Sequence, residues 1–249
     1  MQRKMSEIDR ETPGEPHLSV VIPAYNEEQY LPACLRALRQ QKDAPPFEVI
    51  VVDNASTDST ACIAGQFGAH VVAEPRKGVA RARQSGFEAA RAPIVASTDA
   101  DTIVPPDWLA RIAAHFQAAP DLGGVYGPVR WPDGRPIERL ILRHVVTRGQ
   151  WLSNRARRDL WWGSNFAVRR VVFWRAGGFP VDWPCWEDND LSLRVSRITP
   201  VRFDPDLIVY ASSRRAQEGW GKLGRDTTIR AVERFVLRRP PSIPMVDLR

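Results

Sequence analysis

The stretch Ile94-Val95-Ala96-Ser97-Thr98-Asp99-Ala100-Asp101-Thr102 is an apolar, β-prone run that stops at two carboxylates separated by one small residue. In a strand, residues i and i+2 point to the same side, so Asp99 and Asp101 are expected to face together and to repel each other. A divalent cation that carries a diphosphate would relieve this repulsion, because hard cations prefer oxygen ligands and often keep substrate phosphates in their shell. The alternative is a polar turn in which one of the carboxylates caps the next helix.

The chain around this stretch alternates short apolar runs with amphipathic segments. The predicted strands are 18–23, 47–53, 69–73, 94–97 and 123–129. The predicted helices are about 30–38, 60–67, 78–91 and 105–118. Strands and helices that alternate over short links predict an α/β fold with a single Rossmann-like, mostly parallel sheet and helices on both faces. Pro23, Asp53 and Asp99 end or follow predicted strands, so three loops are expected to meet at the edge where such sheets bind ligands.

Composition restricts the class of protein. The chain has 249 residues, of which 43% are hydrophobic and 26% charged, a balance that suits one large core. A net charge of +6 favours anionic partners such as nucleotides, phosphates or an anionic membrane face. No helix-turn-helix, zinc or aromatic RNA-reading pattern occurs, so a nucleic-acid partner is not expected.

Other sequence features bear on location. No run of about 18 apolar residues encodes a membrane span, and residues 1–9 are too polar for a signal peptide. Cys34, Cys62 and Cys185 are far apart and form no CxxC pair. This spacing argues against a disulfide framework or a zinc site and fits a reducing cytosol.

Residues 130–175 carry eleven arginines and only three acids. Apolar residues within this segment lie near one helical face and are flanked by arginines and a tryptophan: Ile137, Leu140, Ile141, Val145 and Leu152, beside Arg139, Arg143, Arg148 and Trp151. One interpretation is a helix that packs on the core and exposes a basic face. The other is a helix that contacts a membrane surface or a lipid phosphate.

Four segments stand in an order typical of one enzyme family: Val20 to Glu28, Val51 to Asp58, Gly78 to Gly86, and Asp99-Ala100-Asp101. The pattern resembles the family 2 glycosyltransferases, inverting enzymes with the glycosyltransferase A fold, over roughly residues 17–215. Three later segments also match: Gly163-Ser164-Asn165, Gly177-Gly178-Phe179 and Trp186-Glu187-Asp188.

The resemblance implies a nucleotide-diphosphate sugar donor, a UDP- or GDP-sugar. Sugar transfer needs stabilisation of the diphosphate leaving group and a base that deprotonates the acceptor hydroxyl. On this resemblance, Pro23, Tyr25 and Glu27 line the nucleotide pocket. Asp53 accepts a hydrogen bond from the base, and Arg83 lies near the base and phosphates, although a turn aspartate and a solvated helix arginine are the simpler alternatives.

The resemblance also assigns the metal and the base. Asp101 would bind Mg²⁺ or Mn²⁺ directly, and Asp99 would hold the ribose or a metal-bound water. Asp188 is the expected catalytic base, and Glu187 is expected to orient the acceptor or the site. The alternative for these last two acids is a cluster that complements the dipole of the helix that they begin.

Three departures from the family pattern bear on these expectations. The family usually has Asn where this chain has Gln84. Many members carry a metal-binding His after the last core strand, whereas residues 206–215 contain none. The pair Arg214-Arg215 is expected to neutralise part of the diphosphate instead, the alternative being a solvated basic turn. Residues 217–220 lack the Gln-x-x-Arg-Trp motif of processive synthases, so we expect one sugar to be added per encounter.

Together these features predict an inverting glycosyltransferase that acts in cell-envelope or exopolysaccharide glycan synthesis on a glycan or lipid-linked acceptor. We expect a cytoplasmic protein with peripheral contact on the inner face of an anionic membrane. The expected organisation is a tail at 1–16, a domain at 17–236 and a tail at 237–249, the domain dividing into a nucleotide-binding half at 17–104 and an acceptor-side half at 105–236. A smaller acceptor-side region is expected beside the main sheet. The alternative is a catalytically silent nucleotide-sugar-binding or scaffolding subunit of the same fold.

Overall fold

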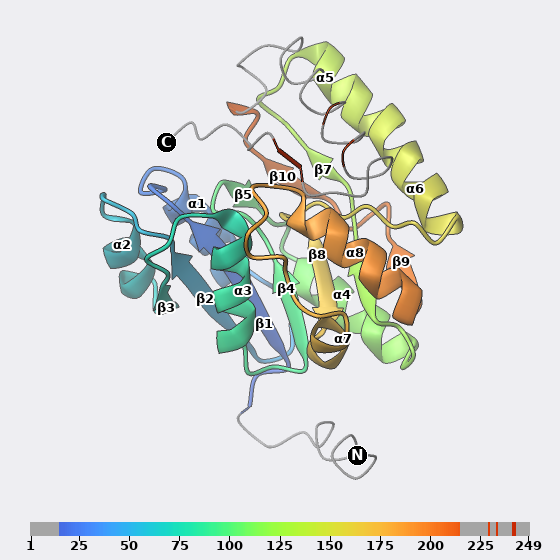
Figure 1. The fold of residues 1–249 in the computed structure, drawn as a ribbon. Helices are drawn as coiled ribbons and strands as arrows, with labels where there is room; N and C mark the ends of the chain where they lie inside the picture. Colours follow the sequence, from blue (N-terminus) through green and yellow to red (C-terminus); the bar gives the residue numbers. More distant parts are fainter. Residues whose placement is uncertain (1–14, 215–228, 230–232, 234–240, 243–249) are drawn as a thin grey trace.

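A computed structural model describes residues 15–214, 229, 233 and 241–242. The predicted tails lie outside the described residues except for residues 15–16 and 241–242, and residues 217–220 lie outside them altogether. The centre of the molecule is a seven-stranded sheet with the strand order β3-β2-β1-β4-β8-β6-β9 (Figure 1). Its strands are β1 (Leu18–Ala24), β2 (Phe47–Asp53), β3 (His70–Ala73), β4 (Ile94–Ser97), β6 (Gly124–Tyr126), β8 (Phe166–Arg169) and β9 (Val201–Phe203).

The sheet is mostly parallel, as predicted. Strands β1, β2, β3 and β4 pair in parallel, and so do β6 and β9. Only β8 runs antiparallel to its neighbours β4 and β6. β8 was not predicted, because it follows a loop without alternating polarity.

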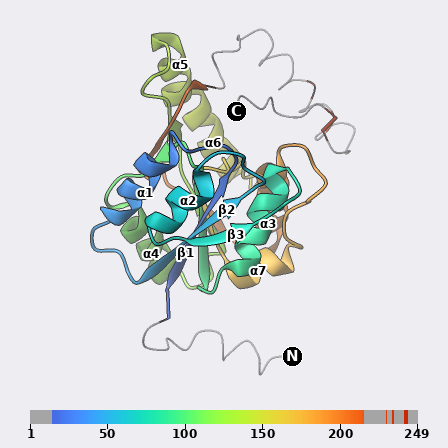
Figure 2. The same cartoon turned by 90° about the vertical axis from the view of Figure 1, so that its left-hand side faces the viewer.

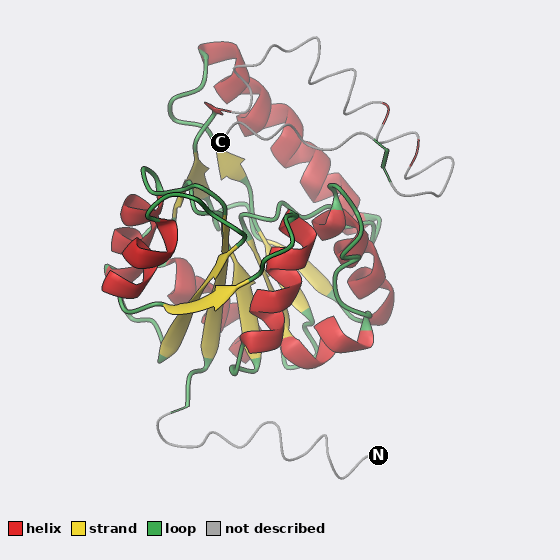
Figure 3. Cartoon of the chain, turned by 60° about the vertical axis from the view of Figure 1, so that its left-hand side comes forward, coloured by secondary structure: helices red, strands yellow, loops and turns green. Residues whose placement is uncertain are grey.

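Helices cover both faces of the sheet (Figure 3). They are α1 (Leu31–Arg39), α2 (Thr60–Gln66), α3 (Val79–Ala89), α4 (Trp108–Ala118), α7 (Arg170–Arg175) and α8 (Glu187–Ile198). Alternation along β1 divides the core, because successive side chains of a strand point to opposite faces. Val20 and Ile22 belong to a cluster with α1 and α4, whereas Val21 belongs to one with α3, α7 and α8. The predicted α/β fold is therefore confirmed.

A smaller sheet lies above the carboxyl ends of the main strands (Figure 1). It contains β5 (Thr102–Ile103), β10 (Val209–Ala211) and β7 (Val129–Arg130), in the order β5-β10-β7. A helical rod adjoins it, formed by α5 (Pro136–Leu140), the π-helical turn η2 (Ile141–Val146) and α6 (Thr147–Arg155). Viewed from the side, α5 rises clear of the α/β layers (Figure 2). Among the described helices, none has both the length and the apolar character that crossing a membrane requires.

Two local expectations were wrong. The strand expected at 123–129 is divided into β6 and β7, which belong to different sheets, because Pro128 cannot donate to a strand ladder. Strand β4 ends at Ser97, so Asp99 and Asp101 lie in the turn before β5 rather than on a strand. Strand alternation therefore does not set the direction of these two carboxylates.

The buried side chain of Asn165 joins the main sheet to the smaller one. Its amide nitrogen donates to the carbonyl oxygens of Pro128 and Leu207, at 3.1 and 2.6 Å, and its oxygen accepts from the indole nitrogen of Trp108 at 3.0 Å. Gly127 fits beside this junction because a Cβ there would collide with the carbonyl oxygen of Leu207. The approach of these two backbone segments thus requires glycine.

We predict that Gly127→Ala lowers the free energy of unfolding by about 1–3 kcal/mol, the usual cost of forcing atoms into a packed interior. Gly65→Ala is the matched control, since Gly65 is helical and a Cβ there would meet nothing within 4 Å. It should stabilise the protein by roughly 0.4–1 kcal/mol. Urea unfolding measures both changes, and equal stabilities for the two variants would contradict the account.

Candidate active site

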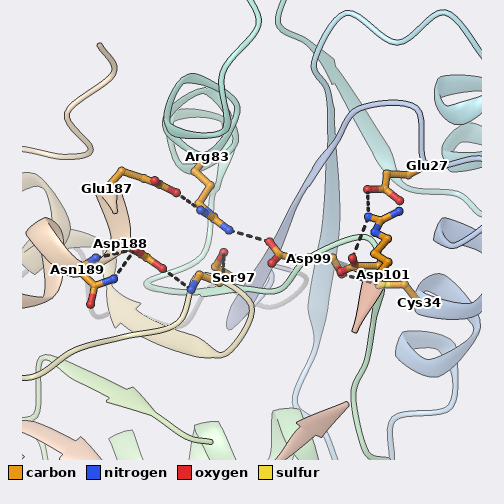
Figure 4. A network of polar contacts seen from close by, with 11 residues as sticks. Glu27, Cys34, Arg83, Ser97, Asp99, Asp101, Glu187, Asp188 and Asn189 are labelled. Carbon is orange, nitrogen blue, oxygen red and sulfur yellow. Dashed lines mark hydrogen bonds and ion pairs between the residues drawn. The ribbon is translucent and has the colours of Figure 1, made fainter. Parts of the chain in front are cut away.

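A buried arginine lies between two acids at the edge formed by the strand ends (Figure 4). Arg83 of α3 places Nη2 2.7 Å from Oδ1 of Asp99, and its Nη1 donates to Oε1 of Glu187 at the start of α8. The side chains of Arg83 and Glu187 are only 5% and 2% exposed, so water contributes little to their charge compensation. These contacts join the β4–β5 turn, α3 and α8.

The charges in this group depend on one another. Burial alone would lower the pKa of Arg83, but the carboxylates of Asp99, Glu187 and Asp188 outweigh that effect and hold it above its usual value. Burial raises the pKa of Glu187, and the positive charge of Arg83 only partly offsets this rise. A single guanidinium thus stabilises several acids that would otherwise be costly to bury.

Asp188 is half-buried and lies next to this group. Its Oδ2 accepts from the backbone N–H of Gly163 at 2.6 Å, and its Oδ1 accepts from the backbone and side-chain nitrogens of Asn189 at 2.7 and 3.0 Å. Burial raises its pKa above the usual aspartate value, although Arg83 and these hydrogen bonds oppose the shift. Trp186, with φ of +63°, turns the chain directly before α8 and so sets the direction in which the acids enter the site.

Gly163 is a residue whose role the sequence analysis missed. Its carbonyl oxygen accepts from Oγ of Ser97 at 2.8 Å, and its N–H holds Asp188. A Cβ at this position would collide with the guanidinium of Arg83. Only glycine lets this segment pass over the buried arginine, and the motif Gly163-Ser164-Asn165 was the available signal.

Asp101 lies in a second group with a different arginine. Nη2 of Arg214 is 2.8 Å from Oδ2 of Asp101 and 2.5 Å from Oε1 of Glu27. Its guanidinium carbon lies 4.4 Å from the ring centre of Tyr30. Burial would lower the pKa of Arg214, but these acids, above all Glu27, hold it above its usual value. Cys34 is close by, with its Sγ 3.6 Å from the carbonyl oxygen of Asp99, and burial raises the pKa of its thiol.

The remaining predicted site residues lie at the same end of the sheet. Pro23 is buried near the end of β1, and Asp53 ends β2, where it accepts from the backbone N–H of Ser56 at 3.3 Å. The hydroxyl of Tyr25 contacts the ammonium of Lys77, which lies 4.0 Å from the centre of the Tyr25 ring. The expected meeting of loops at one edge is therefore present, while the assigned roles of these residues stay predictions.

Two further polar side chains fix α3, which carries Arg83. Asn54 donates to the carbonyl oxygens of Glu74 and Arg76 at 3.0 and 2.8 Å and accepts from the N–H of Gly78 at 2.8 Å. Gln84, where the family usually has Asn, accepts from the N–H of Phe179 at 2.9 Å. The position of Asn54 after a strand could have signalled its role, whereas the distant partner of Gln84 could not be read from the sequence.

The predicted metal ligands do not form a metal site as they stand. Asp99 is paired with Arg83, and Asp101 with Arg214. Within the part of the chain that the structure describes, no group of three His, Cys, Asp or Glu residues is placed to hold a metal ion. These side chains therefore do not fit a resident divalent cation, which would have to compete with a guanidinium for Asp101.

The fold is that of a glycosyltransferase A-type protein. The family model "Glycosyl transferase family 2" matches residues 19–176, so the chain belongs to this family. Validoxylamine A glucosyltransferase of Streptomyces hygroscopicus subsp. limoneus is 31% identical over 226 residues, which cover 76% of this chain and 49% of that protein. The chain spans about half the length of the first curated relatives that it matches.

Solved structures agree on the fold. A mannosyltransferase from Pyrobaculum calidifontis in complex with GDP-Man and Mn²⁺ superposes with a TM-score of 0.67 and 23% identity, covering 92% of this chain and 68% of that one. Glucosyl-3-phosphoglycerate synthase from Mycobacterium tuberculosis, with Mn²⁺, UDP and glucosyl-3-phosphoglycerate, gives a TM-score of 0.64 and 20% identity, covering 94% and 88%.

We predict that Arg83→Met destabilises the protein by about 3–5 kcal/mol at pH 8, because it leaves buried acids without their cation. The loss should be smaller at pH 5. Burial already raises the pKa of Glu187, and removing Arg83 raises it further, so the folded variant binds protons more tightly than the unfolded chain. Stability that depends on these protons is present at low pH and is lost as the pH rises through the folded-state pKa.

Arg81→Met is the matched control on the same helix. Arg81 pairs with Asp182, whose side chain is 82% exposed, so this change should cost less than about 1 kcal/mol. Urea unfolding at both pH values measures the difference. An Arg83 effect that is no larger than the Arg81 effect, or one that does not change with pH, would show that the buried group is not held by charge.

Proposed function

We propose that this chain transfers a single sugar from a UDP- or GDP-sugar to an acceptor hydroxyl, with inversion at the anomeric carbon. The observation that carries the proposal is the half-buried carboxylate of Asp188 beside the group of Arg83, Asp99 and Glu187, at the carboxyl ends of β1, β2 and β4. Open α/β sheets bind ligands at this edge. Family membership and the donors named with the solved neighbours support the choice of nucleotide sugar.

In the proposed reaction, Asp188 accepts the proton of the acceptor hydroxyl. The acceptor oxygen then forms a bond to the anomeric carbon, the bond from that carbon to the diphosphate oxygen breaks, and the nucleoside diphosphate leaves with the electron pair. A raised pKa suits a base that must accept a proton near neutral pH. The N–H of Gly163 and the two nitrogens of Asn189 hold the carboxylate in place during this step.

The other residues bind and position. Pro23, Tyr25, Glu27 and Asp53 are proposed to contact the nucleotide. Arg83 is a positioning residue, since its guanidinium is committed to Asp99 and Glu187. Asp99 is proposed to contact the donor ribose, and Glu187 to orient the acceptor. Mg²⁺ or Mn²⁺ at Asp101 stays a prediction from the sequence, and the contacts of Arg214 weigh against it.

Asp188→Asn should lower the turnover of donor by roughly 10²–10⁴-fold, the usual contribution of general base catalysis, while the Kd for nucleoside diphosphate stays unchanged. The measurement is release of UDP or GDP from UDP-glucose, UDP-N-acetylglucosamine or GDP-mannose, with calorimetry for the Kd. Asp190→Asn is the matched control, because Asp190 pairs with Arg194 on the same helix. Turnover by Asp188→Asn as fast as by Asp190→Asn would overturn the assignment of the base.

A catalytically silent nucleotide-sugar-binding or scaffolding subunit is the competing function. The pairing of both Asp99 and Asp101 with arginines favours it, since neither carboxylate is held for a metal. If the chain is such a subunit, the unmodified protein should bind a nucleotide but release no UDP or GDP from any of the three donors. The same release assay therefore separates the two functions.

We also propose that the rod of α5, η2 and α6 contacts an anionic membrane, which would present a glycan or lipid-linked acceptor on the cytoplasmic face and suit cell-envelope synthesis. The core-packing interpretation of the rod is wrong for most of its apolar residues. The exposed ones are Ile137, Leu140, Val145, Trp151 and Leu152. The inward positions instead include the polar residues Glu138 and Gln150.

Charge on the outer face of the rod points to one kind of partner. Arg139, Arg143, Arg148 and Arg155 are exposed there, and the only acid between 136 and 155, Glu138, is buried against the N–H of Arg135. Apolar side chains interleaved with arginines and without acids match an anionic lipid surface, which accepts both. The rod lies at the same end of the molecule as the candidate site (Figure 1).

Sedimentation with vesicles tests this contact. The protein should bind phosphatidylcholine vesicles that contain phosphatidylglycerol, and added salt should weaken the binding. Leu140→Glu with Trp151→Glu should reduce it by roughly tenfold or more. Trp174→Glu is the control, since Trp174 is 45% exposed on α7 at the other end of the molecule. Binding that is unaffected by the double substitution, or self-association of the chain through this face, would contradict the proposal.

A further inference from the structure

Arg214 occupies the place beside Asp101 where the sequence predicts a metal ion. Its Nη2 contacts Oδ2 of Asp101 and Oε1 of Glu27, and its side chain is only 14% exposed. Glu27 and Asp101 face the same point from the β1–α1 loop and the β4–β5 turn (Figure 4). Two carboxylates therefore pair with one guanidinium in a largely buried position.

The backbone sets this position. Residue Ala211 of β10 pairs with Thr102 of β5, and the N–H of Ser212 donates to the carbonyl oxygen of Asp101 at 3.2 Å. The N–H of Ser213 donates to the carboxylate of Asp133 at 3.0 and 3.1 Å. Arg214 follows these anchored residues directly, so its approach to Asp101 is a consequence of strand pairing.

Tyr30 adds a third constraint, because its ring lies 4.4 Å from the guanidinium carbon of Arg214. A guanidinium that is stacked on an aromatic face keeps its plane fixed. Both contacts to the acids are made by Nη2, and the guanidinium carries further N–H donors on Nη1 and Nε in the same plane. An N–H of Nη1 can donate a charge-assisted hydrogen bond to an oxygen of a diphosphate.

We infer that Arg214 takes the place of a divalent metal ion at this site, binding the diphosphate of the donor so that donor binding needs no metal. The inference rests on the proposed function, since it assumes a nucleoside diphosphate at this edge of the sheet. It explains why Asp101 pairs with a guanidinium. It also explains why residues 206–214 contain no histidine of the kind that binds a metal ion in many family members. A metal at Asp101 would have to displace Arg214 or bring two cations together.

Calorimetry on the unmodified protein is the first test. UDP, GDP, CDP and dTDP are titrated into metal-stripped protein with EDTA, and again with MnCl₂. The nucleotide that binds should do so with Kd values that agree within about twofold in the two conditions, because binding is then not linked to metal. Binding that requires Mn²⁺ would overturn the inference alone. No binding by any nucleotide in either condition would overturn the proposed function as well.

Variants then test the residue itself. Arg214→Ala should raise the Kd by about 10- to 100-fold, the range for loss of a charged hydrogen-bonding partner. Arg214→His should bind weakly with EDTA and recover with MnCl₂, because imidazole is a good metal ligand. Arg91→His is the matched control, since Arg91 pairs with Glu48 at 2.8 Å at the opposite edge of the sheet. It should show no dependence on metal.

Melting curves without ligand check that each variant is folded, and they do not enter the comparison of affinities. Arg214→Lys keeps the charge and loses the planar fork, so it should bind more weakly than the unmodified protein and still show no gain from MnCl₂. Unchanged affinity in Arg214→Ala would show that the guanidinium does not touch the diphosphate, and would overturn the inference even if binding is independent of metal.

Discussion

The candidate site depends on the buried guanidinium of Arg83. It lies between Asp99, in the turn after β4, and Glu187, which is 104 residues away in the chain at the start of α8. A buried charge-paired group of this kind contributes little net stability, because desolvation offsets most of the attraction. Its effect is on position, since the loss of any member leaves an uncompensated charge. The two halves of the chain are thereby held so that Asp188 reaches the edge where the donor is proposed to bind.

A second arginine does the same for the other carboxylates. Arg214 pairs with Glu27 and Asp101, and the pairing of β10 with β5 brings it there. The site therefore contains two fixed guanidinium groups beside carboxylates. Charges that are already oriented do not need to reorganise when a diphosphate leaves, which is the main advantage of a preorganised site over water. This arrangement separates the chain from the simple expectation of a metal held by two neighbouring aspartates.

The local order of apolar and polar residues was sufficient to predict most of the strands of the main sheet and the helices that flank them. It also predicted the edge of the sheet at which polar residues gather. Asp53 and Asp99 each end or follow an apolar run, and such runs end at one edge of a parallel sheet. This local order was insufficient to predict contacts between residues that are distant in the sequence. The contact of Arg83 with Glu187 and that of Gln84 with Phe179 depend on how two halves dock, and no periodicity records it.

The rod at 136–155 shows a related limit. Its apolar spacing is that of a helix that packs on a core, yet Leu140 and Leu152 are exposed and Gln150 is buried. The spacing of apolar residues identifies the apolar face of a helix, but it does not show whether that face packs on the core or is exposed to solvent. Likewise, the need for glycine at position 127 depends on the backbone of Leu207, about eighty residues further along the chain.

The central claim is that the edge formed by β1, β2 and β4 binds a nucleoside diphosphate. The melting temperature of the full chain with UDP, GDP, CDP and dTDP tests it most directly. A ligand at about 100 times its Kd stabilises the folded state by about 2.7 kcal/mol, which for a chain of this size is a rise of roughly 5–10 °C. The account predicts such a rise for at least one of these nucleotides and none for its nucleoside. An unchanged melting temperature with all four would contradict it.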